Sequence, residues 1–335
     1  FISTFGNINM YASYLSISIP VLLAVFAFCK NWFSRILSGI LLIAAGCNIL
    51  IANSDSVFLG IFAGVVVVTI LAFMQGRLRY SSFAVFLLFV GNLVLGFINK
   101  YGHTRYDKKR GGLAIALNRL DIAFVLCGAA LLVFAVVCVC NWKLGTRVAA
   151  WNKKKIVLIV CGACVALGVI GIIVLAVTGS SLLTFNDKWG SYRGYIWRKI
   201  VEVYGDAPFV NKLFGYGNES VRVTLKAACY NEMVQVTGKV YDNAHNELLQ
   251  YLFTTGIVGL LSYLALVGSS IVYMFKHAKE HAWISVCLAA TVGYFAQSIL
   301  NLNQPITTPL FFVFMAMGVG TVNYCRRVKE LEKRA

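Results

Sequence analysis

The residues best suited to chemistry stand in the segment 241–250, which reads Tyr-Asp-Asn-Ala-His-Asn-Glu-Leu-Leu-Gln. It lies between the longest polar segment and an apolar run that begins near Gly256, and its His245 is one of only four histidines in 335 residues. Asp242 or Asn243 is a suitable N-cap for a helix that carries His245 in its first turn. There the helix macrodipole disfavours the charged imidazole, and a general base must be neutral at physiological pH. The segment therefore predicts a proton-transfer site centred on His245.

Two carboxylates near His245 bear on this prediction. Asp242 lies three residues before His245 and is placed to orient the ring if the turn is already helical, whereas Glu247 points away from it on a helix. A lone histidine in a membrane protein also serves as a packing or interfacial residue. We favour chemistry because ionisable groups at membrane depth tend to be functional.

The segment 191–204 has the pattern of an amphipathic helix. Tyr192, Ile196, Ile200 and Tyr204 follow helical spacing, and the charged residues stay off that stripe. The pattern predicts a helix lying in the plane of the membrane interface. With Ser191 as N-cap, Arg193 falls in the first turn of the helix, and Arg198 follows further along it. A helix N-terminus that carries a guanidinium group suits a phosphate ligand. The alternative is a membrane-anchoring helix whose arginines touch lipid headgroups.

A basic connector, 100–119, carries six positive charges and one acid. One interpretation is a solvated loop that has no ligand. The other is that Arg105, Arg110 and Arg119 attract an anionic ligand at the outer face of the membrane. The pair of Arg119 and Asp121 also suits an anchor for the helix that begins there.

Several kinds of chemistry lack their motifs in this sequence. It has no His and Cys cluster at zinc spacing, no phosphate-binding glycine loop, no paired aspartates for a divalent metal and no G-x-S-x-G elbow. The ten cysteines lie mostly in or beside apolar runs, so we expect no disulfide framework. We therefore expect a reaction without metal or cofactor, in which Arg supplies charge and His transfers the proton.

The surrounding chain has the composition of an integral membrane protein. It is 59% hydrophobic and 13% charged, against about 25% charged residues in soluble domains, with a mean hydropathy of +0.76. A span needs about 20 apolar residues, and strand alternation is absent, so the pattern predicts an all-α polytopic bundle of about nine spans. These are 10–28, 36–52, 56–73, 82–98, 120–140, 156–177, 256–274, 284–302 and 308–324. We expect an N-terminal bundle at 1–177, a loop region at 178–255 and a C-terminal bundle with a basic tail at 256–335.

The net charge of +17 orients these spans. If the C-terminus is cytoplasmic, the inside connectors hold 16 of the 30 Lys and Arg residues on roughly 50 residues, as the positive-inside rule requires. The long loop and His245 then lie on the extracytoplasmic face of the cell membrane. No soluble basic domain is available for nucleic acid. Phe1 also falls outside, so we expect an odd number of further spans upstream, in a longer protein.

Several motifs, taken in order along the chain, resemble those of the O-antigen ligase and Wzy-type polysaccharide polymerase family. The segment 244–250, followed by 255–260, resembles the family signature HNxxLQ…xGxxG. Three more pieces agree in order. The first is 4–9 with Tyr11 and Ala12, the second is Arg193 with Trp197, followed by Pro208 and 214–217, and the third is Gln297 with 309–311. One segment departs from the family pattern: many members have Ser-Arg-Gly at the start of a span where this chain has Ser54, Asp55 and Ser56.

The resemblance implies a membrane glycosyltransferase of the GT-C-like class. It implies transfer or polymerisation of a glycan from an undecaprenyl-diphosphate donor onto a sugar hydroxyl of a glycan or lipid-glycan acceptor, with inversion and without metal. It implies that His245 is the base or positions the acceptor, and that Arg193 neutralises the leaving diphosphate.

Further substrate-binding candidates are Asn246 and Arg198. The Ser-Arg-Gly arginine of the family, which would be a second cation for the diphosphate, is absent here, so other residues must be considered in its place. Either Asp55 plays another part, such as a helix N-cap, or the basic connector with Arg105, Arg110 and Arg119 supplies the charge.

Two hypotheses of other classes remain. One is a transporter or flippase for a polyprenyl-linked or anionic solute, and the other is a fragment without activity of its own. Transporters place ionisable groups at mid-membrane in broken helices with internal repeats. This chain shows no repeat, and its charges cluster at the outer face, which favours the enzyme. The motifs are the same for ligation and for polymerisation.

Overall fold

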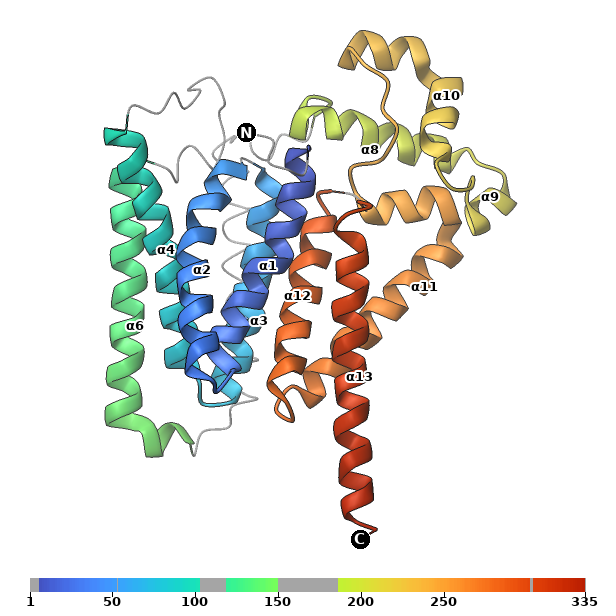
Figure 1. The fold of residues 1–335 in the computed structure, drawn as a ribbon. Coiled ribbons are helices and arrows are strands. Elements are labelled where there is room, and N and C mark those ends of the chain that lie inside the picture. Colours follow the sequence, from blue (N-terminus) through green and yellow to red (C-terminus); the bar gives the residue numbers. More distant parts are fainter. Residues whose placement is uncertain (1–5, 53, 103–118, 150–185, 302–303, 335) are drawn as a thin grey trace. The chain divides into compact units, whose positions relative to one another are not determined.

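The computed structural model describes residues 6–52, 54–102, 119–149, 186–301 and 304–334, and their regular secondary structure is entirely helical (Figure 1). The predicted all-α class is therefore confirmed. The helices are α1 (Ile8–Phe28), α2 (Trp32–Ala52), α3 (Asp55–Met74), α4 (Leu78–Tyr101), α6 (Leu120–Ala149), α8 (Trp189–Gly205), α9 (Phe209–Phe214), α10 (Ser220–Thr237), α11 (Glu247–His277), α12 (Ala282–Ser298) and α13 (Thr308–Glu332).

Seven of the described helices are long and apolar enough to cross a membrane: α1, α2, α3, α4, α6, α11 and α13. The eighth apolar helix, α12, has only 17 residues. These eight coincide with eight of the nine predicted spans, and the ninth, 156–177, lies outside the described residues. The chain is a polytopic helical membrane protein.

The chain divides into two compact units. The first, called the bundle below, comprises residues 1–153, 269–298 and 303–335. The second unit comprises residues 154–268 and 299–302, and its described part holds α8, α9, α10 and most of α11. The predicted site residues His245 and Arg193 both belong to the second unit.

The bundle is built around α12, which packs against α1, α3 and α13 and buries twelve of its 17 residues. Small residues allow the helix backbones to approach closely, as is common in membrane bundles. A Cβ atom on Gly60 of α3 would lie 2.6 Å from Ser16 Oγ of α1 and 2.7 Å from the carbonyl oxygen of Gly293 of α12. The three helices therefore cross at a point that only glycine permits.

The start of α3 differs from the prediction for Asp55. Ser54 is the N-cap residue, with extended backbone angles, so Asp55 is the first helical residue and not the cap. Ser54 Oγ lies 3.0 Å from Ser56 Oγ, and Gln297 Nε2 of α12 donates to Ser56 Oγ at 3.3 Å. The prediction was one position out because Ser and Asp are both good caps.

Helix α11 bends at Gly256, where φ is +69° and ψ is −172°. The carbonyl groups of Phe253 and Thr254 accept hydrogen bonds from the N–H groups of Tyr216 and Gly217, at 2.9 and 3.0 Å. The loop after α9 thus satisfies polar backbone groups beside the bend. The bend marks the position where the sequence predicts the start of a span, and the 21 residues that follow it in α11 are long enough to cross a membrane.

Candidate active site

The core of the second unit is formed by the buried face of α8. Tyr195, Ile196 and Ile200 are fully buried and pack with Val221 and Leu225 of α10. Tyr192 and Tyr204, which complete the predicted apolar stripe, pack against the same cluster. The stripe is therefore covered by protein, which corrects the expectation that a membrane covers it. The apolar residues of a helix have the same spacing whether protein or lipid covers them, so the sequence does not distinguish the two.

A left-handed turn precedes Arg193. Gly190, Ser191 and Tyr192 have φ values of 58°, 61° and 70°, so the right-handed part of α8 begins only at Arg193. Ser191 is consequently not the N-cap that its residue type predicts. Each non-glycine residue in this conformation costs about 1–2 kcal/mol. A Cβ atom on Gly190 would lie 3.3 Å from Arg193 Cδ, so the turn carries the aliphatic part of the Arg193 side chain.

His245 lies before α11 and not in its first turn. Asn246 is the N-cap: its Oδ1 accepts from the Leu249 N–H at 3.0 Å, and its carbonyl oxygen accepts from the Gln250 N–H at 2.9 Å. The His245 N–H donates to Asn243 Oδ1 at 3.1 Å, and His245 has a φ of +48°. Asn243 thus closes a small turn that places His245 in the left-handed region.

Three hydrogen bonds fix the His245 loop. Tyr241 Oη donates to the Ser191 carbonyl oxygen at 3.0 Å, and Trp197 Nε1 donates to the Ala244 carbonyl oxygen at 2.8 Å. The Ala244 N–H donates to Gln250 Oε1 at 2.9 Å. The first bond reaches the left-handed turn before Arg193, and the second reaches the helix that carries Arg193. The structure therefore brings the two predicted catalytic residues into one cluster.

The Trp197 bond leads to a prediction that is independent of activity. Trp197→Phe removes the donor to the buried Ala244 carbonyl, which weakens the loop by about the net strength of one hydrogen bond. We expect amide hydrogen exchange in 241–250 to become about two- to ten-fold faster. Trp283→Phe, the same change in the bundle, should leave this exchange unaltered. Unchanged protection in the Trp197 variant would show that the bond does not hold the loop.

The surroundings of His245 lower its pKa from 6.5 to about 4. Burial is the largest cause, the positive charges of Arg193 and Lys239 add to it, and Asp242 opposes it. The Nδ1 atom is buried and has no hydrogen-bond partner among the described residues, and the Tyr241 ring stands edge-on at a centroid distance of 5.9 Å. The imidazole is thus neutral at physiological pH for reasons other than the predicted position in a helix turn.

The lowered pKa of His245 makes the loop sensitive to acid. Between about pH 6.5 and pH 4 the unfolded loop binds more protons than the folded one, so stability falls as the pH falls through this window. We expect exchange of the amides in 241–250, corrected for intrinsic pH effects, to accelerate across it. His245→Asn should remove the acceleration. Equal acid sensitivity in both proteins would mean that another group is responsible.

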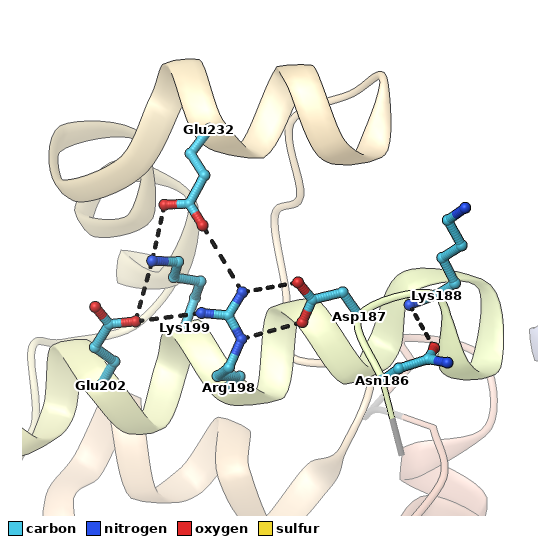
Figure 2. A network of polar contacts seen from close by, with 7 residues as sticks. All are labelled: Asn186, Asp187, Lys188, Arg198, Lys199, Glu202 and Glu232. Carbon is cyan, nitrogen blue, oxygen red and sulfur yellow. Dashed lines mark hydrogen bonds and ion pairs between the residues drawn. The ribbon is translucent and has the colours of Figure 1, made fainter. Parts of the chain in front are cut away.

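Arg198 belongs to the α8–α10 ion network, which consists of Asp187, Arg198, Lys199, Glu202 and Glu232. Figure 2 shows Glu232 of α10 reaching both Lys199 and Arg198 of α8, at 2.8 and 3.8 Å. Arg198 also forms two hydrogen bonds to Asp187, at 2.9 and 3.1 Å. The hydrogen bond to Glu232 is the largest cause of the raised pKa of Lys199, which keeps this nearly buried ammonium charged. We therefore assign Arg198 to holding α8 and α10 together, and its role in substrate binding stays a prediction.

Arg198→Gln tests this assignment. The change removes a member of a network that joins two helices, and we expect faster amide exchange in α10. Arg198 is not among the charges that shift the His245 pKa, so that pKa should stay unchanged. Lys188→Gln is the matched control, because its backbone N–H contacts Asn186 Oδ1 and its side chain forms no ion pair within the described residues. A large change in the His245 pKa would contradict the assignment.

The remaining predicted residues are more scattered. Asn246 caps α11, so a role in substrate binding stays a prediction. Arg119 lies in the bundle before α6 and pairs with Asp121 at 2.8 Å, with both side chains largely exposed. Asp55 opens α3 in the bundle. Arg105 and Arg110 lie outside the described residues.

Three residues that help to build the site were not predicted for that role. Lys239 affects the charge of His245, and Tyr241 and Gln250 fix its loop. The last two stand within the motif, but the sequence does not indicate what they bind. Among the residues that the structure describes, no three His, Cys, Asp or Glu side chains converge as metal ligands do.

The fold and the cluster define a polytopic helical membrane protein with a neutral histidine held near an arginine. Residues 111–264 match the family model Wzy_C, described as O-antigen ligase, and this range includes α8, α9, α10 and His245. This match identifies an O-antigen ligase domain in the chain and supports a function in membrane polysaccharide biosynthesis. No curated protein sequence matches the chain.

Proposed function

We propose that this chain transfers a glycan from an undecaprenyl-diphosphate-linked donor to a sugar hydroxyl, at the extracytoplasmic face of the cytoplasmic membrane. The observation that carries the proposal is the neutral His245 beside the charge of Arg193, inside the O-antigen ligase domain. A base and a cation are the two groups that such a transfer requires of the protein.

In the proposed reaction the acceptor hydroxyl oxygen attacks the anomeric carbon of the donor glycan. The bond from that carbon to the diphosphate oxygen breaks, and its electron pair remains on the diphosphate. His245 takes the hydroxyl proton, because a neutral imidazole has one unprotonated ring nitrogen that can accept it. A single displacement of this kind inverts the anomeric centre.

Arg193 has two roles in this proposal. Its guanidinium offsets the negative charge that grows on the leaving diphosphate, the charge that a divalent metal offsets in other phosphate chemistry. It also lowers the His245 pKa. A bound diphosphate offsets that charge, so donor binding raises the His245 pKa and makes it a stronger base. The base would then reach its full strength only with the donor in place.

Reconstitution tests the reaction directly. Purified protein in lipid nanodiscs receives an undecaprenyl-diphosphate-linked oligosaccharide and a glycan acceptor, with and without EDTA. We expect mass spectrometry to find a new glycosidic bond of inverted configuration in both samples. Loss of product with EDTA would refute the metal-independent mechanism. In sealed proteoliposomes, translocation of the donor without any new bond would support a flippase.

A deletion strain separates ligation from polymerisation. Single repeats on the acceptor would indicate that a polymerase was lost. Intact but unattached polymer would indicate that a ligase was lost. A wild-type glycan pattern would contradict both forms of the proposal.

A further inference from the structure

A second polar site lies at the end of the bundle where three connectors meet. These connectors join α1 to α2, α3 to α4 and α11 to α12, and the ends of their helices meet at one end of the bundle (Figure 1). They enclose a hollow of about 580 Å³, whose lining includes Lys30, Arg77 and Lys279. One cationic residue thus comes from each connector.

The positive charge in this hollow is not balanced by nearby acids. Within the described residues, none of Lys30, Arg77 and Lys279 forms an ion pair. The one carboxylate of the lining, Glu280, is already engaged by His277 at 2.8 Å and by Lys329 at 3.1 Å. Three like charges that converge without counter-charges favour an anionic ligand.

The hollow is held in shape by contacts between the connectors. Gln75 Nε2 donates to the Ala278 carbonyl oxygen and to Ser285 Oγ, both at 3.2 Å. Arg77 Nη1 donates to the Ala27 carbonyl oxygen at 3.4 Å. These bonds join the second connector to the last turn of α1, to the third connector and to α12, so the backbone that carries the cations is held before any ligand binds.

We expect the hollow to lie at the depth of a membrane interface. Each of the three connectors directly follows a helix that is able to span a membrane. Trp283 lines the hollow and is 44% exposed, and Trp32 and Phe33, which follow the first connector, are 71% and 59% exposed. Exposed aromatic rings beside basic residues are typical of the headgroup region. The anion available at that depth is a phospholipid headgroup.

We propose that this hollow binds the phosphate of an anionic phospholipid headgroup, with Lys30, Arg77 and Lys279 as its cationic partners. The inference is independent of the glycan-transfer proposal, because the residues belong to the bundle and not to the second unit. Such a site would bind one lipid for long periods, unlike the exchanging lipids around the helices.

Native mass spectrometry tests the site on the full chain. Delipidated protein is titrated with phosphatidylglycerol and with phosphatidylcholine of identical acyl chains. We expect phosphatidylglycerol to bind more tightly, and Lys30→Gln and Lys279→Gln to weaken it about five-fold each. Lys333→Gln removes a charge from the C-terminal end of α13, outside the hollow, and should have no effect. Equal loss in all three variants, or none, would refute the site.

Fluorescence locates the lipid and identifies its source. Brominated phosphatidylglycerol should quench the Trp283 signal, obtained as the difference between wild type and Trp283→Phe, more strongly than brominated phosphatidylcholine. Millimolar inorganic phosphate should leave the quenching unchanged. If inorganic phosphate abolishes it, the hollow is a site for soluble phosphate. Equal quenching by both lipids would show that the headgroup is not recognised.

Discussion

Replacing His245 with alanine is expected to reduce glycan transfer by about 10²- to 10⁴-fold, the usual contribution of a positioned acid or base. His245 is half-buried, and its lowered pKa leaves the imidazole neutral at physiological pH, so alanine removes this base from the site. The measurement is the initial rate with saturating donor in nanodiscs. A variant that retains the wild-type rate would remove His245 from the mechanism.

The matched control is His245→Asn. His245 has a φ of +48°, and asparagine tolerates this conformation better than alanine does. The asparagine variant should keep the amide protection of 241–250 and still lose transfer. If only the alanine variant is inactive, strain in the loop and not lost proton transfer explains the defect.

Replacing Arg193 with glutamine is expected to reduce transfer by about 10²- to 10³-fold, as for the loss of one group that stabilises developing negative charge. Arg193→Lys keeps the charge but loses the planar guanidinium, and should retain part of the rate. The measurement is the rate as a function of donor concentration. Unchanged rates across all donor concentrations in the glutamine variant would remove the assigned role.

Arg193→Gln has a second expected effect, on the pH profile. The charge of Arg193 lowers the His245 pKa, so its removal should raise that pKa from about 4 towards 6.5. The acid limb of kcat/KM, which reports the free enzyme, should shift upward with it. A limb that stays in place would show that Arg193 does not act on His245 electrostatically.

The membrane helices could be predicted from the sequence because length and apolar composition nearly suffice to define them. The helix boundary beside His245 could not. Asp242, Asn243 and Asn246 are all good caps, and the choice depends on the turn that Asn243 makes with His245. The apolar stripe of α8 was predicted with its spacing, but spacing does not distinguish lipid from a protein core.

The partners of Arg198 were also beyond prediction. Glu232 belongs to a different helix, and only the packing of α10 on α8 brings it near. For the same reason, the sequence predicts substrate binding at Arg198, whereas the structure shows that it also links α8 to α10. The arginine and histidine of the motif, by contrast, could be proposed together because the family resemblance pairs them.

The left-handed turn at 190–192 has a consequence for biosynthesis. Its backbone is locally unfavourable, and its hydrogen bond comes from Tyr241, which lies 50 residues further along the chain. A nascent chain that has reached α8 therefore lacks the partner that stabilises this turn. We therefore expect Arg193 to settle into its position only after Tyr241 has been synthesised and its loop has docked. Because Tyr241 and His245 lie in the same loop, we expect the cation and the base of the site to be assembled together during synthesis.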